Sequence, residues 1–71
     1  MRTITFYNET YKDTDNIYLT MTIDGNKTIV DQYETLQEFL ESLYPTIDEI
    51  LYHINYHPDY DTVKININYE K

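Results

Sequence analysis

Four stretches of the chain are predicted to be strands. Apolar and polar residues alternate, as in strands that bury one face, from Thr3 to Asn8, from Asn16 to Asp24, and in the fourth stretch, from Thr62 to Tyr69. The third stretch, from about Thr28 to Gln32, is expected to pair back on the second. The only glycine, Gly25, lies where a tight hairpin turn requires a positive φ. The inward positions predicted by the alternation are Ile4, Phe6, Ile17, Leu19, Met21, Ile23, Val63, Ile65, Ile67 and Tyr69.

Between the third and fourth stretches the hydrophobic period changes from two to 3.6, which indicates helix. Thr35 followed by Glu38 forms a capping box that predicts a helix from about Thr35 to Leu43. Pro45 should end this helix, since proline lacks an N–H and restricts the residue before it. Thr46 and Glu49 repeat the capping signature, so a second helix is expected to end near Tyr56. The buried faces predicted for the two helices contain Leu36, Phe39, Leu40, Leu43, Ile47, Ile50, Leu51 and Ile54.

The resulting order, β-β-β-α-α-β, predicts an α+β fold with two layers. We expect an antiparallel sheet covered on one face by two short helices. With 71 residues, the chain has the length of one small domain, residues 1–71.

The net charge of −8 argues against direct binding of nucleic acid or an anionic membrane, because both require cations on the protein. It favours a basic partner, although an acidic surface that only maintains solubility is the plainer explanation. The first residues alternate where a signal peptide would be continuously apolar, and no apolar run is long enough for a membrane span. We therefore expect a soluble protein of the cytoplasm.

The stretch from Thr28 to Thr62 contains eight carboxylates and neither Lys nor Arg. Three of its acids, Glu34, Glu38 and Glu41, should form a single file opposite the buried face of the first helix. Acids three or four residues apart on a helix are about 5–6 Å from one another, which is comparable with the spacing of phosphates along a DNA strand. The remaining acids of the stretch are Asp31, Asp48, Glu49, Asp59 and Asp61.

Tyrosines accompany these acids. Tyr52 and Tyr56 are predicted side by side on the outer face of the second helix, with Tyr60 and Tyr44 nearby. Tyrosine is enriched at binding hot spots, so the four predict an aromatic patch bordered by acids. The alternative is that codons of an AT-rich genome place tyrosines on the surface without a role, since the chain has nine Tyr.

Catalytic and metal-binding motifs are weak. The chain has no Cys, a single Ser at position 42, and no glycine-rich loop, so we predict neither an enzyme nor catalytic residues. His53, His57, Asp59 and Asp61 cluster in nine residues, but Pro58 should unwind the helix at His57. We therefore predict neither a metal nor a cofactor.

In size, acidity and lack of catalytic motif, the chain is similar in type to small inhibitors that phages and mobile elements make against host nucleases. These include anti-CRISPR and anti-restriction proteins that imitate DNA. The leading hypothesis is an inhibitor, acting as monomer or homodimer, that occludes the cleft of a basic nucleic-acid-binding protein of the host. The alternatives are a structural or regulatory docking module that binds through a sheet edge or the tyrosine patch, and an antitoxin. The residues predicted to contact the partner are Glu34, Glu38, Glu41, Asp48, Glu49, Tyr52, Tyr56, Asp59, Tyr60 and Asp61.

Overall fold

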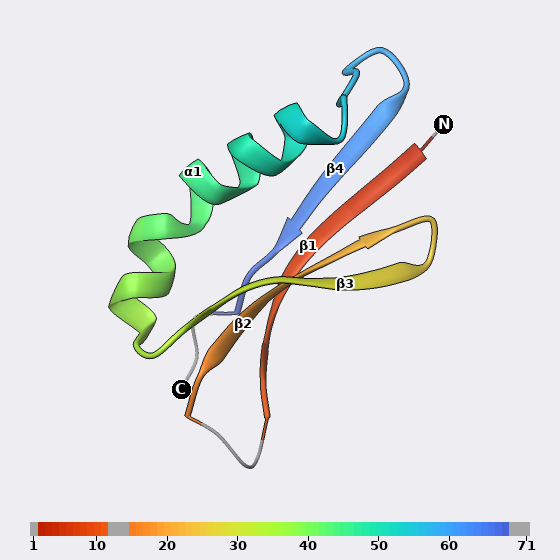
Figure 1. The fold of residues 1–71 in the computed structure, drawn as a ribbon. Helices are drawn as coiled ribbons and strands as arrows, with labels where there is room; N and C mark the ends of the chain where they lie inside the picture. Colours follow the sequence, from red (N-terminus) through yellow and green to blue (C-terminus); the bar gives the residue numbers. More distant parts are fainter. Residues whose placement is uncertain (1, 12–14, 69–71) are drawn as a thin grey trace.

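A computed structural model describes residues 2–11 and 15–68 of the chain. It is a small α+β fold with four strands in one sheet and a helix across one side of that sheet (Figure 1). The elements in chain order are β1 (Arg2–Thr10), β2 (Ile17–Ile23), β3 (Asn26–Tyr33), α1 (Leu36–His53) and β4 (Asp61–Asn66). The α+β class and the coverage of one sheet face agree with the sequence analysis.

The first three strands form an antiparallel meander. Ile23 pairs with Asn26, so the hairpin between β2 and β3 has a two-residue turn. Both turn residues have positive φ, 52° at Asp24 and 86° at Gly25, which is the type I′ geometry that matches the twist of the flanking strands. The predicted turn is therefore confirmed, and β3 is longer than expected.

The prediction of an all-antiparallel sheet is wrong, because β4 runs parallel to β1. The strand order is β3-β2-β1-β4, so the sheet is mixed. A helix, rather than a hairpin, connects β3 to β4, and such a crossover returns the chain in its original direction. The last strand also ends at Asn66, and the inward position predicted for Tyr69 lies outside the described residues.

The prediction of two helices is also wrong, since α1 continues through Pro45. Pro45 is exposed, so the carbonyl of Glu41, which loses its usual N–H donor, can be solvated. Leu43 and Ile47, on either side of the proline, are both buried in the core. Burying two such side chains contributes about 1.5–3 kcal/mol each, which outweighs a proline cost of about 3 kcal/mol. Packing therefore keeps the helix continuous.

Both ends of α1 are capped. The Thr35 hydroxyl accepts a hydrogen bond from the Glu38 amide at 3.1 Å, which confirms Thr35 as the predicted N-cap. At the other end Asn55 adopts a left-handed conformation, with φ of 63°. The Tyr56 amide donates to the Leu51 carbonyl at 3.0 Å and the Asn55 amide donates to Tyr52, as in a Schellman motif. The helix therefore ends at His53, before the predicted limit.

No helix among residues 2–11 and 15–68 is long and apolar enough to span a bilayer.

The core lies between α1 and the sheet. The alternation correctly predicted the inward side chains of β1 and β2, whereas Leu40, predicted inward, is 37% exposed on the flank of the helix. The main surprise is Thr20, which is fully buried although it faces away from the helix. The buried apolar residues are Ile4, Phe6, Leu19, Met21, Tyr33, Phe39, Leu43 and Ile47.

Replacing Pro45 tests the continuous helix. We expect Pro45→Ala to raise the free energy of unfolding by about 2 kcal/mol. The substitution removes the cost of about 3 kcal/mol of a proline inside a helix. It also gives up about 0.4–1 kcal/mol of stability, because alanine leaves the unfolded chain with more conformational entropy than proline does. Urea denaturation followed by circular dichroism measures this change. A two-helix arrangement with Pro45 as the breaker predicts no gain, and Ser42→Ala, on the same helix, serves as the control for general helix propensity.

Candidate protein-binding face

The continuity of α1 places acids from both predicted helices on one surface. At 100° per residue, Glu38, Glu41, Asp48, Glu49 and Tyr52 fall within an arc of about 100°. The centre of this arc is about 170° from Leu43, which is buried against the sheet. We call these five residues the acidic helix face.

The acidic helix face has little internal compensation. The helix contains neither Lys nor Arg. Its closest base is His53, whose Nε2 lies 3.8 Å from Oε1 of Glu49, and both side chains are well exposed. Gln37 donates a hydrogen bond to Glu41 at 3.0 Å, which leaves the charge of that carboxylate unchanged. The face therefore presents four carboxylates to solvent.

The other predicted contacts are placed differently. Glu34 is exposed but precedes the N-cap, so it does not continue the file of Glu38 and Glu41 along the helix. Tyr52 is 78% exposed on the acidic helix face. Tyr56 is half-buried beyond the helix end, so the predicted side-by-side arrangement with Tyr52 is wrong. The reason is the left-handed Asn55, which redirects the chain between the two tyrosines.

The segment after the helix is folded on itself. The rings of His57 and Tyr60 stack, with centroids 4.9 Å apart and planes inclined by 20°. Tyr60 remains half-exposed, and Asp59 is exposed beside it. These two residues remain accessible to a partner.

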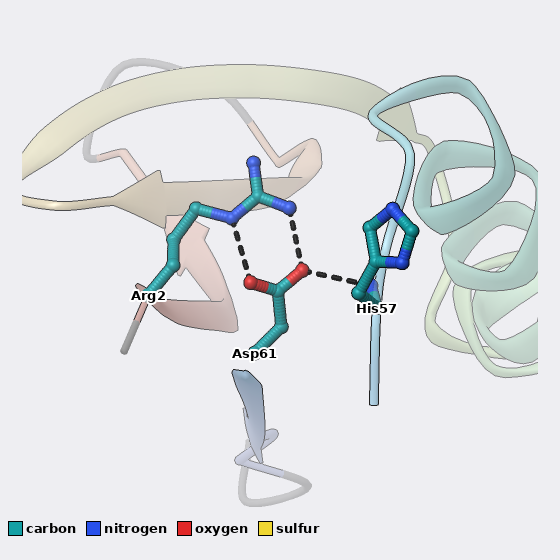
Figure 2. Close-up of polar contacts among 3 residues, drawn as sticks. All are labelled: Arg2, His57 and Asp61. Carbon is teal, nitrogen blue, oxygen red and sulfur yellow. Dashed lines mark hydrogen bonds and ion pairs between the residues drawn. The ribbon is translucent and has the colours of Figure 1, made fainter. Parts of the chain in front are cut away.

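Asp61 is a structural residue and not a surface acid. Its side chain is completely buried, and its carboxylate accepts three hydrogen bonds (Figure 2). Arg2 donates Nε to Oδ1 at 3.0 Å and Nη2 to Oδ2, and the His57 amide donates to Oδ2 at 2.9 Å. The parallel register sets Arg2 directly beside Asp61. Sequence spacing could not reveal this pair, because its members are 59 residues apart.

The surroundings of Asp61 change its acidity. The hydrogen bonds from Arg2, together with the His57 amide, lower the pKa of the Asp61 carboxyl, although burial opposes this shift. The same contact raises the pKa of the Arg2 guanidinium. The carboxylate therefore stays ionised in the folded protein under conditions that protonate an ordinary aspartate.

A second polar cluster, which the sequence analysis missed, lies on the sheet face opposite α1. Glu9 accepts hydrogen bonds from Thr20 at 2.9 Å, Lys27 at 3.0 Å and Tyr11 at 3.3 Å. The ring of Tyr11 also meets Tyr18 edge to face, with centroids 5.0 Å apart. Alternation indicated that Thr20 and Tyr18 point away from the helix, but only the pairing of β1 with β2 and β3 reveals their neighbours.

The comparisons and the remaining chemistry identify no known site. In the part of the chain that the structure describes, no group of three or more His, Cys, Asp or Glu residues could hold a metal ion. No protein-family model, curated protein or solved structure matches this chain.

Acid titration tests the role assigned to Asp61. A pKa that is lower in the folded than in the unfolded state contributes stability that is present at neutral pH and is lost as the pH falls. We therefore expect the melting temperature to decline below about pH 4, the ordinary range of aspartate, and to continue declining through the lowered pKa. In Asp61→Asn, melting is expected at a lower temperature at neutral pH and with a flatter acid profile. Asp59→Asn is the matched control, and equal profiles for both variants would contradict the assignment.

Proposed function

We propose that this protein is a binding inhibitor whose acidic helix face occupies the basic cleft of a nucleic-acid-binding protein. The observation that carries the proposal is the alignment of Glu38, Glu41, Asp48 and Glu49 on one exposed helix face without an adjacent Lys or Arg. A phage or mobile-element origin, with a host defence nuclease as target, is the form of this function that fits the small acidic chain best.

Charge density supports imitation of one nucleic-acid strand. Glu38 and Glu49 are eleven positions apart, which corresponds to about 16 Å along the helix axis. Four carboxylates over that length give one charge per about 4–5 Å, against one per about 3.4 Å for a DNA strand and one per about 1.7 Å for the duplex. The helix is therefore a substitute for one strand, and a cleft that binds single strands or one duplex edge fits it best.

Tyr52 supplies the contact that charge alone does not give. It is exposed within the acidic helix face and has few rotatable bonds, so its burial in a complex loses little side-chain entropy. Pro45 is exposed on the same outward side of the helix. We expect the carboxylates to set the association rate and its salt dependence, and Tyr52 to set the lifetime of the complex.

An antitoxin that caps a basic toxin has the same electrostatics and is a variant of this proposal. A docking module whose acidity serves only solubility is distinct, because its binding does not require the acidic helix face. Competition by nucleic acid separates the two, because DNA displaces the protein from its target only if the protein occupies the target's nucleic-acid-binding cleft.

The test uses the immobilised protein to capture basic proteins from a bacterial lysate fraction that has been enriched on heparin. We expect captured proteins to be released by added DNA and by raising the salt concentration. Once a captured protein has been identified, Glu41→Lys is expected to slow its association about tenfold or more, because it places a cation in the middle of the face.

Asp15→Lys is the matched control, since it makes the same change of charge at an exposed position outside the helix. Equal slowing by both variants would show that net charge alone matters and would contradict a defined face. Binding that neither DNA nor salt affects would favour the docking module. Circular dichroism of both variants establishes that the fold is retained.

A further inference from the structure

The last strand of the sheet has one free edge. Among the residues that the structure describes, β4 lies beside β1 and has no strand on its other side (Figure 1). The Arg2 amide donates to the Tyr60 carbonyl at 2.9 Å, and alternate residues of a parallel strand bond to its neighbour, so the even-numbered residues of β4 bond to β1. The backbone N–H and C=O groups of Val63 and Ile65 therefore point to the free edge.

The free edge continues beyond the end of β4. The side-chain amide of Asn8 donates to the Asn68 carbonyl at 3.0 Å, and its oxygen accepts from the Asn68 amide at 2.8 Å. This side chain thus bonds to Asn68 as the backbone of a neighbouring strand would, and it continues the even-numbered series that faces β1. Ile67 lies just before Asn68, so its backbone groups point to the free edge as those of Val63 and Ile65 do.

The side chains along this edge are apolar on the side of the sheet that α1 covers. Val63 pairs with Ile4 and Ile65 pairs with Phe6, and both partners are completely buried in the core. Ile67 also packs against the core. Ile65 is nevertheless 39% exposed. An edge that combines exposed apolar surface with outward backbone donors and acceptors is a template for a further strand.

The opposite edge of the sheet, formed by β3, is less suited to pairing. The register of β3 on β2 shifts between Leu19 and Thr20, which is a β-bulge. The Gln32 amide donates to the Asp31 carboxylate of the same strand at 2.8 Å, so this donor is already taken. Both features interrupt a regular ladder, whereas β4 pairs in unbroken register and contains no proline.

The free edge of β4 is complementary to the same edge of a second copy. Two antiparallel edges related by a two-fold axis at Ile65 set Ile65 opposite Ile65 of the second copy. The same register sets Val63 opposite Ile67 of that copy. All three residues point their backbone groups across the contact, so each pair exchanges both of its N–H···O bonds, and each pair also joins two apolar side chains.

Lys64 selects this register. A two-fold axis at Lys64 would set two ammonium groups directly opposite one another, which is destabilising. It would also leave Ile67 without an apolar partner. With the axis at Ile65, Lys64 lies opposite Asn66 of the second copy, so like charges do not meet on the sheet face away from α1.

We propose that β4 pairs with β4 of a second copy, which joins two four-stranded sheets into one continuous sheet. The two-fold axis is perpendicular to this sheet, so both acidic helix faces lie on the same side of the dimer. Each chain carries a charge of −8, so repulsion opposes association and salt promotes it. The dimer does not rest on the inhibitor function, because the acidic helix face takes no part in the pairing.

Sedimentation equilibrium from about 10 μM to about 1 mM, at low and at moderate salt, tests the proposal. We expect the apparent mass to rise from 8.6 kDa toward twice that value, and to rise at lower protein concentration when the salt is increased. Salt has the opposite effect on the proposed target complex, so either proposal can fail without the other. A wild type that stays at 8.6 kDa under all conditions would overturn the dimer.

A charge at the axis tests the position of the contact. Ile65→Lys should weaken dimerisation at least about tenfold, because it sets two cations opposite one another. Ile29→Lys is the matched control, since it makes the same change at an isoleucine of β3 that is 49% exposed, and it should leave the dimer unchanged. Circular dichroism of both variants establishes that the fold is retained. Equal weakening by both would contradict pairing through β4.

Mixing two variants tests the register. Ile65→Lys and Ile65→Glu should each dimerise weakly alone, because like charges meet across the axis. An equimolar mixture should form a mixed dimer, since opposite charges then face one another. This recovery requires that position 65 of one copy lies opposite position 65 of the other. A mixture whose mass does not exceed that of the separate variants would overturn the two-fold pairing at Ile65.

Discussion

The ion pair between Arg2 and the buried Asp61 joins the first and last strands, and the arrangement of the helix depends on that junction. A buried carboxylate is costly unless its oxygens are paired, and here two guanidinium donors and the His57 amide satisfy them. The Arg2 amide also donates to Tyr60, and the Asp61 amide donates to His57. These bonds fix the turn between α1 and β4, which sets β4 parallel to β1. The crossover is thereby held at a defined length and direction.

That crossover explains why the helix is continuous. The chain must pass from β3, at one edge of the sheet, to β4, at the other edge. One helix with Leu43 and Ile47 buried on either side of Pro45 spans this path and covers the core. The continuous helix then has a single outward side, on which acids before and after Pro45 become neighbours. The functional surface is thus a consequence of the packing that tolerates Pro45.

The molecule separates its charge between two sides. The acidic helix face is negative, whereas the sheet face opposite α1 has an internal Glu9–Lys27 pair. The carboxylates of α1 and this ion pair therefore lie on opposite sides of the molecule.

The sequence by itself determined the features that depend on neighbouring residues. Alternation identified β1, β2 and β4, Asp24 and Gly25 identified the hairpin turn that leads into β3, and Thr35 identified the start of the helix, because each signal acts within a few residues. The tertiary structure decided what depends on distant contacts. It carried the helix through Pro45, since core packing outweighs a local penalty, and it made β4 parallel. It also buried Asp61 against Arg2, which is 59 positions away, so Asp61 is not part of the binding surface. The sequence does not reveal this partner, because only the pairing of β1 with β4 brings the two residues together.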